Sequence, residues 1–300
     1  MNPNQHSTIM KKLFLLIAGL GFLAAIIGCL LGLTAKKVFA DERFFAQRVK
    51  GSGRIVTRMQ EVPAFQAIEA SRSVEVIVTG TESRTARIDA DDNLIDKVIV
   101  TVEEGKLKVG IDRSVKDLRD CHVSVTAPHP DGLRSLVANS AAQIRCKQPL
   151  TAAKTKLSAS SAARIVAAVE ATECKIDASS AAMIEATVKA TDCDIETSSA
   201  SQIEATVNAA KCDIAASSAS KIEIEGTAQE CEADLSSASK LTAKNFAVQH
   251  YDIETSSGSS ARIRCTERLQ AKASSGSLIR YSGRCETRIS KSSGGSVHAE

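Results

Sequence analysis

Four cysteines recur at a constant spacing and are the first residues whose chemistry needs an explanation. Cys174, Cys193, Cys212 and Cys231 are nineteen residues apart each time. Neighbouring thiols can bind a metal or form disulfides, whereas a free buried thiol behaves as a small hydrophobic side chain. The chain has no C-x-x-C pair, and its histidines fall outside this series, so zinc spacing is missing. The pattern favours a ladder of thiols in the core, with disulfides between adjacent copies as the alternative.

Acidic residues recur with the same period. One series consists of Glu185, Glu204 and Glu223, and a second consists of Asp194, Asp213 and Glu232. Like charges held close together repel one another unless a cation or a neighbouring base relieves them. Lys221 offers one such base beside Glu223. The two series therefore predict either a solvated acidic face or a weak site for divalent cations.

No other group of residues predicts catalysis or a bound cofactor. The serine pairs lack the G-x-S-x-G elbow of hydrolases. His122, His129 and His250 are isolated in the sequence, and Tyr251 stands where the next ladder cysteine is expected. We expect the tyrosine to belong to the core, and we expect no catalytic residue, no cofactor and no dedicated metal site.

The period extends well beyond the cysteines. Paired serines follow it from Ser160/Ser161 to Ser236/Ser237 and continue, with small slips, to Ser292/Ser293. An apolar residue comes about five positions after each pair, as Ile203 does after Ser198. About nine copies fill residues 133–300. Self-similarity at a fixed period predicts a repeat architecture.

Within one copy, apolar and polar residues alternate, as from Ile203 to Val207. A period of two predicts strands, and the small polar S-S-A-S cluster suits a tight corner between two short strands. Two short strands cannot bury their own apolar face, so the copies must stack. We therefore predict an all-β fold, a parallel β-solenoid of short coils whose cysteines face inward about 4.8 Å apart.

Composition and charge agree with a narrow solenoid. Apolar residues make up 43% of the chain and aromatic residues only 3%, so small aliphatic side chains must build the core. Residues 173–235 hold thirteen acids and four bases, whereas residues 261–291 hold eight bases and two acids. The solenoid should be acidic in its middle and basic toward its C-terminal end. Without aromatic platforms or a nucleic-acid motif, nucleic acid is not an expected partner.

The N-terminal region predicts export. Residues 13–35 form an unbroken apolar run that is long enough to cross a bilayer as one helix. We interpret it as an uncleaved signal-anchor; a signal peptide cleaved after Ala40 and a lipoprotein signal acylated at Cys29 are the alternatives. All three place the body of the chain outside the cytoplasm. Exposed thiols are liabilities in an oxidising compartment, so the cysteine ladder should be buried.

A series of motifs precedes and enters the repeats. It contains G-x-G-x-I-V at 51–56, P-A-F-x-x-I-E at 63–69, V-x-V-x-V-T-G at 74–80, D-x-N-L-I-D at 91–96 and G-K-L-K-V at 105–109. From about residue 55 to 285 the chain resembles the bacterial putative auto-transporter adhesin, head GIN domain family. The resemblance implies a right-handed β-helical fold in a protein of the cell envelope or surface, and it brings no catalytic residue. The family often has a glycine in the corner where this chain has S-S-A-S.

The predicted organisation is an N-terminal anchor over residues 1–40, a linker over 41–54, a strand-rich cap over 55–132 and the solenoid over 133–300. We expect a membrane-tethered, non-catalytic structural or adhesion module of the bacterial envelope. Residues 13–35 would bind the membrane, and the repetitive surface would bind an envelope polysaccharide or protein.

Two alternatives to this function stay open. The first is a β-helical lyase or hydrolase that acts on polysaccharides, which would need carboxylates converging on one site. The second concerns assembly, since unpaired strand edges at the C-terminal end predict an end-to-end homodimer.

Overall fold

The computed structural model describes residues 48–80 and 84–300, which are almost entirely β-structure. The predicted anchor over residues 13–35, with the alternative sites at Cys29 and Ala40, lies outside the described residues. In the described ranges, no helix is long and apolar enough to span a bilayer. Lys50–Ser114 and Leu118–Glu300 form one compact unit.

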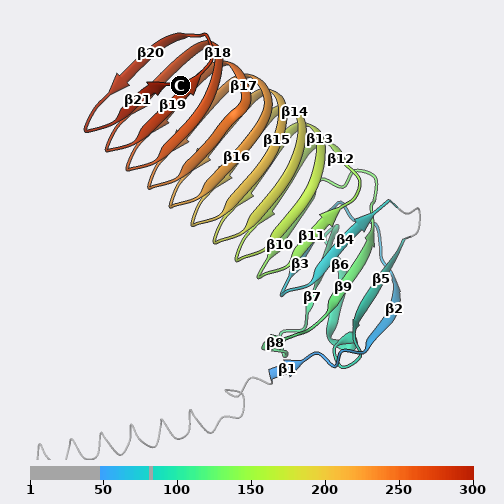
Figure 1. Ribbon diagram of the computed structural model, residues 1–300. Coiled ribbons are helices and arrows are strands. Elements are labelled where there is room, and N and C mark those ends of the chain that lie inside the picture. The colour runs from blue at the N-terminus through green and yellow to red at the C-terminus, as the bar shows by residue number, and fades with distance from the viewer. Residues whose placement is uncertain (1–47, 81–83) are drawn as a thin grey trace, which may run out of the picture. The chain divides into compact units, whose positions relative to one another are not determined.

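The greater part of this unit winds into a stack of coils (Figure 1). Its long strands are β12 (Leu150–Ala159), β13 (Arg164–Ala178), β14 (Met183–Thr197), β15 (Gln202–Ala216), β16 (Lys221–Leu235), β17 (Lys240–Thr255) and β18 (Ser260–Ala273). Shorter strands complete the stack: β10 (Ser135–Asn139), β11 (Gln143–Cys146), β19 (Leu278–Ser282), β20 (Glu286–Lys291) and β21 (Ser296–Ala299). Every strand pairs in parallel with its equivalent in the next coil. The predicted parallel β-solenoid is confirmed.

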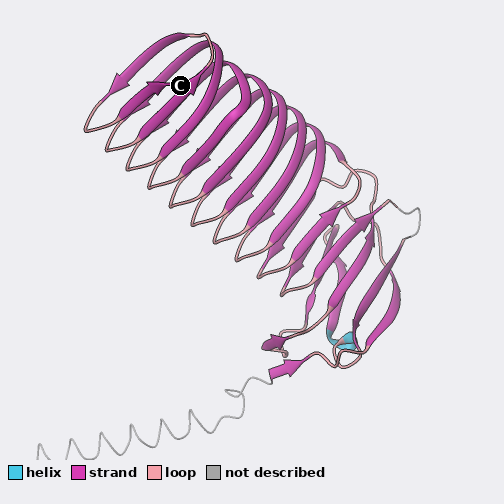
Figure 2. Ribbon diagram, viewed as in Figure 1, coloured by secondary structure: helices cyan, strands magenta, loops and turns pink. Residues whose placement is uncertain are grey.

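The coils differ from the prediction in one respect. We expected two short strands per copy, but β13 to β16 are each one strand of 15 residues that runs from one sharp corner to the next. Figure 2 shows these long strands joined by short loops. In β15 none of the residues 208–211 is buried, yet Asn208 and Lys211 both keep their partners in β16. This bend turns the strand without breaking its pairing, and because it contains no glycine or proline, the sequence carried no signal for it.

The core consists of equivalent residues stacked on one another. Ile184 pairs with Ile203 and Val188 with Val207, and all four side chains are buried. Since paired strands lie about 4.8 Å apart, each side chain packs against its own equivalent in the next coil. Burying such a side chain contributes roughly 1.5–3 kcal/mol. β17 departs from this scheme because it buries Phe246, and its register shifts against both neighbouring strands.

The sharp corner of each coil holds two residues in the left-handed region. In the corner 198–201, φ is 54° at Ser199 and 58° at Ala200, and the Ser201 N–H donates to the Ser198 carbonyl at 3.2 Å. Two positive φ values are typical of a type I′ turn, in which glycine or asparagine is usual. The Ala200 N–H also donates to the Ser218 carbonyl of the next corner at 3.0 Å. These bonds between corners offset a backbone strain of about 1–3 kcal/mol per residue.

The N-terminal part of the unit continues the stack and then closes it. It contains β2 (Ile55–Glu61), β3 (Ala67–Ser71), β4 (Glu75–Thr79), β5 (Thr85–Asp91), the short helix η2 (Ile95–Lys97), β6 (Val98–Glu103), β7 (Lys106–Ile111) and β9 (Val123–Pro128). β3 pairs in parallel with β10, and β4 pairs in parallel with β11. The parallel strand pairing of the solenoid therefore continues across the predicted boundary at residue 132. Beyond them the pairs β6–β7, β2–β5 and β5–β9 are antiparallel. The division at residue 132 remains a prediction. The remaining strands, β1 (Arg48–Lys50) and β8 (Asp117–Arg119), are three residues long each.

Side chains replace backbone pairing where β2 meets β6. Arg58 donates to the carbonyls of Ile95 at 3.2 Å and Val98 at 3.0 Å, and Gln60 donates to the Val100 carbonyl at 2.6 Å. The Val98 and Val100 carbonyls belong to β6 and would otherwise form an open strand edge, whereas the Ile95 carbonyl belongs to η2. The closed end therefore needs no further strand over these carbonyls.

The D-x-N motif holds the G-x-G segment in place. Asp91 is 1% exposed and accepts hydrogen bonds from the backbone N–H groups of Gly53 at 2.8 Å and His122 at 2.7 Å. Asn93 donates to the Lys50 carbonyl at 2.9 Å. A buried carboxylate needs such donors to offset the cost of leaving water, so the motif has a structural role.

We predict that Ala200→Gly stabilises the protein, because glycine adopts a positive φ without strain. The expected gain in the free energy of unfolding is about 1 kcal/mol, measured by the shift of the urea midpoint. Ala205→Gly, within the strand that follows, is the matched control and should be destabilising by a similar amount. A lower urea midpoint for Ala200→Gly would show that the corner is not strained.

Candidate functional site

The structure places the four periodic cysteines in one inward column. Cys174 pairs with Cys193, Cys193 with Cys212, and Cys212 with Cys231. Each is a free thiol and exposes 3% of its surface or less. The neighbouring thiols Cys193 and Cys231, together with burial, hold the pKa of Cys212 well above its ordinary value. Because all four side chains are shielded from solvent, the column is suited to packing and not to chemistry.

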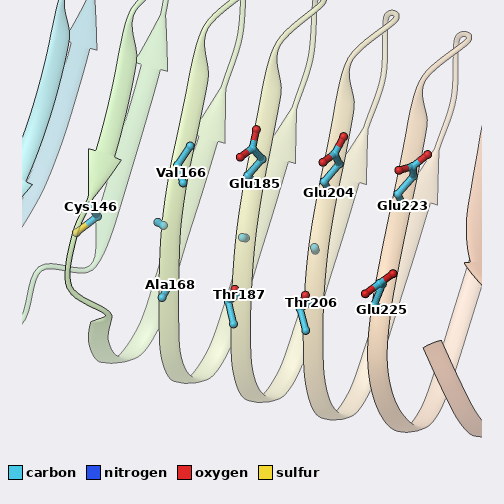
Figure 3. A pocket seen from close by; sticks show the side chains of 12 residues that line it. Cys146, Val166, Ala168, Glu185, Thr187, Glu204, Thr206, Glu223 and Glu225 are labelled. Carbon is cyan, nitrogen blue, oxygen red and sulfur yellow. The ribbon is translucent and has the colours of Figure 1, made fainter. Parts of the chain in front are cut away.

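Glu185, Glu204 and Glu223 form an outward column on the first half of the strands, as Figure 3 shows. Each carboxylate has a partner from its own or the preceding coil. Glu185 forms an ion pair with Arg164. The Gln202 amide donates to Glu204 at 2.6 Å, and the Lys221 ammonium lies 2.6 Å from Glu223. The chain's own side chains therefore relieve the repulsion within this column.

The second acidic column lies on the other half of the strands and is also interleaved with bases. Lys175 contacts Asp194 at 3.0 Å and Glu196 at 2.6 Å, and Lys211 contacts Asp213 at 2.9 Å. Glu196 and Asp194 raise the pKa of Lys175. The column then runs through Glu232, Asp252 and Gln270 to Arg288, so it passes from acidic to basic along the stack.

The predicted cation site gains no support from this geometry. Within residues 48–80 and 84–300, no group of three or more His, Cys, Asp or Glu side chains is arranged to hold a metal ion. The sequence identified Lys221 as a basic neighbour but missed Arg164 and Lys175, because their partners lie in the following coil. Only the observed register brings these residues together.

A shallow trough runs along the stack beside the first glutamate column, and we call it the glutamate trough (Figure 3). One side is lined by Val166, Glu185, Glu204 and Glu223, the other by Ala168, Thr187, Thr206 and Glu225, and the floor by Ala167, Ala186 and Ala205. It encloses about 530 Å³. The floor alanines are buried, so the polar groups open to a ligand are those of the two sides. The sequence showed the glutamates but not the trough, whose walls come from different coils.

Two further hollows lie over the second half of the strands. A trough of about 440 Å³ follows the serine corners and is lined by Asp177, Glu196, Asp234, Glu254, Ser198, Ser217, Ser236 and Ser256, among others. A third hollow, of about 390 Å³, lies where the surface changes from acidic to basic and is lined by Lys211, Glu230, Glu232, His250, Asp252, Arg268 and Arg288, among others. In the trough along the serine corners the acids recur from coil to coil, and in the third hollow the charge changes from acidic to basic along the stack. In neither hollow do the acids surround a single point.

The remaining singled-out residues are not brought together. His122 and His129 lie in the N-terminal part of the unit, whereas His250 lies in β17, 3.3 Å from Glu267. Tyr251 follows Cys231 in the inward column and is 2% exposed. The carboxylates of the glutamate trough are all partly exposed, although their partners differ. A catalytic pair needs one carboxyl group set apart by its surroundings, and burial sets none of these apart, so the arrangement is suited to binding.

We predict that the four column cysteines resist alkylation in the reduced, folded protein. Labelling requires local opening, so it should be slower than at half-buried Cys146 by a factor on the order of 100 or more. Iodoacetamide labelling followed by mass spectrometry measures each site, and labelling in urea is the control. Equal rates at Cys193 and Cys146 would contradict the inward placement.

Comparisons with known proteins agree with this architecture. A putative adhesin from Parabacteroides merdae ATCC 43184 has a similar structure, with a TM-score of 0.65 and 19% identity over 84% of this chain and 99% of that chain. A putative adhesin from Parabacteroides distasonis ATCC 8503 gives a TM-score of 0.63 and 18% identity over 85% and 100% of the two chains. A putative lipid binding protein from the same strain gives 0.61 and 18% identity over the same shares.

At these identities, the similarity shows the fold alone. None of the curated proteins matches the chain. A family model matches residues 64–205 and 181–285, which is more than half of the chain. The chain therefore belongs to the putative auto-transporter adhesin, head GIN domain family.

Proposed function

We propose that this protein is a non-catalytic binding module of the bacterial envelope, and that its solenoid surface binds an extended envelope polysaccharide. The observation that carries the proposal is the register of the outward side chains. Glu185, Glu204 and Glu223 stack on one another, and Thr187 stacks on Thr206. A polymer with its own repeat can make the same contact on each coil.

The chemistry of the glutamate trough suits sugar hydroxyl groups. Carboxylate oxygens accept hydrogen bonds, and threonine hydroxyls both donate and accept them. Each contact is weak, because water competes for the same groups. The coils hold these groups in fixed positions, however, so a polymer that spans several coils orders few protein side chains on binding.

The absence of stacking surfaces on the trough sets a limit on affinity. Its lining residues include no aromatic side chain, and Tyr251 is buried in the core. Sugar rings would therefore bind through hydrogen bonds instead of stacking on aromatic faces. We expect low affinity for single sugars and an affinity that rises with polymer length.

The family and the N-terminal sequence support a location in the envelope. The family is described as a putative auto-transporter adhesin, head GIN domain, and two similar structures are named putative adhesins. A third is named a putative lipid binding protein, but the trough described above is lined mainly by polar and small residues. The apolar run at residues 13–35 would tether the body to a membrane.

The test is binding of the full-length chain, in detergent, to an array of envelope polysaccharides, lipopolysaccharide and peptidoglycan fragments, with and without calcium. Each hit is also assayed for cleavage. We expect binding without turnover. Turnover would favour the polysaccharide-acting enzyme, and binding that requires calcium would support the predicted cation site. An array without any polysaccharide hit would overturn the proposal.

The trough itself is tested by removing the charge of Glu204 and the hydroxyl of Thr206. Glu204→Gln combined with Thr206→Val should weaken polymer binding roughly tenfold, because the lost and weakened hydrogen bonds total about 1–2 kcal/mol. The matched control is Asp213→Asn on the other half of the same strand, which should bind normally. An equal loss in both variants would move the binding site away from the glutamate trough.

A further inference from the structure

Two cysteines outside the buried column lie on neighbouring coils near the C-terminal end. Cys265 belongs to β18, and Cys285 directly precedes β20. Arg264 pairs with Ser282, and Arg268 pairs with Glu286. Residues 265–267 separate the two pairs on one coil, and residues 283–285 separate them on the other. Because the two segments are equal in length, the segment 283–285 stacks on the segment 265–267.

Gly283 brings the two segments into direct contact. Its φ is 106°, and a Cβ atom at this position would lie 2.0 Å from the Cys265 carbonyl oxygen. Only glycine can bring the backbone so close. Cys285 follows Gly283 by two residues, so it lies on the coil next to Cys265 and within the segment that stacks on residues 265–267. Burial and the neighbouring Cys285 thiol raise the pKa of Cys265 to about 11.

Access distinguishes this pair from the buried column. Cys265 is buried, but Cys285 is only half-buried. The column cysteines also neighbour one another, but all four are buried, whereas Cys285 exposes part of its surface to an oxidant. Cys146 is half-buried as well, but no other thiol affects its pKa. Burial raises that pKa, and the hydrogen bond to the Gln148 carbonyl lowers it.

We propose that Cys265 and Cys285 are a disulfide-forming site that joins the last coils of the solenoid when the protein meets a small-molecule or protein disulfide. This inference is independent of the binding function. The Cys285 thiolate attacks a sulfur of the oxidant, which forms a mixed disulfide and releases one thiol. Cys265 then loses its proton and attacks the Cys285 sulfur, which releases the second thiol. Two protein thiols are thereby oxidised, and one external disulfide is reduced to two thiols.

The disulfide would hold the end of the stack together. β20 is exposed along its whole length and pairs within the coils with β18 alone among the described strands. Such an edge is expected to fray first. A covalent bond between Cys265 and Cys285 limits how far this strand can separate from β18.

The test uses the purified full-length chain in a buffer of oxidised glutathione. Remaining thiols are blocked with a maleimide, and the protein is then digested without reduction. Cleavage after arginine would release residues 265–268 and 285–288, which have the same composition. Cleavage after glutamate avoids this ambiguity, because residues 255–267 and 268–286 differ in mass. We expect a linked pair of these two peptides that disappears on reduction.

Variants separate this site from its alternatives. Cys285→Ser should abolish the linked peptide, whereas the matched control Cys146→Ser should retain it. Cys265→Ser should leave Cys285 bound to glutathione, because no second thiol resolves the mixed disulfide. Maleimide on both Cys265 and Cys285 after full oxidation would overturn the proposal, as would a link from either cysteine to the buried column.

Discussion

Parallel stacking in register is the constraint on which the rest of this structure depends. Each residue lies about 4.8 Å from its equivalent in the next coil, so a choice made at one position is repeated along the whole stack. Inside, this places isoleucine on isoleucine and cysteine on cysteine. Outside, it places glutamate on glutamate, which is unfavourable unless bases such as Arg164 and Lys221 are interleaved. The same constraint thus shapes both the core and the charged surface.

The corners show how the stack satisfies its backbone. The last serine of S-S-A-S is buried, and its hydroxyl donates to a carbonyl of the preceding coil: Ser201 donates to the Ala178 carbonyl at 2.8 Å, and Ser239 donates to the Ala216 carbonyl at 3.0 Å. Each of these carbonyls also accepts from a backbone N–H of the same corner, that of Ser198 or Ser236. A buried hydroxyl without a partner would cost about 1–3 kcal/mol. The corner motif is therefore best understood as a hydrogen-bonding unit that links consecutive coils, although its residues are poor formers of left-handed turns.

The sequence predicted what depends on period and missed what depends on geometry between coils. The recurrence of Cys193, Ile203 and the serine pairs was enough to identify the solenoid, because only stacking buries such short units. The bend at residues 208–211 was not foreseen, since ordinary residues turn the strand there. The trough and the Lys175 ion pairs were missed for another reason: they join residues nineteen or more positions apart, and a pattern along one copy cannot show them.

Register also explains why binding is more natural than catalysis on this scaffold. Acid–base catalysis needs two groups whose surroundings move their pKa values apart. A repeat gives equivalent groups similar exposure, so the column of glutamates presents several similar contacts, and burial sets none of its carboxylates apart for a separate role. Specialised chemistry requires a break in the repeat. The C-terminal coils contain such breaks, at the register shifts of β17 and at Gly283, and the Cys265–Cys285 pair lies at the second of them.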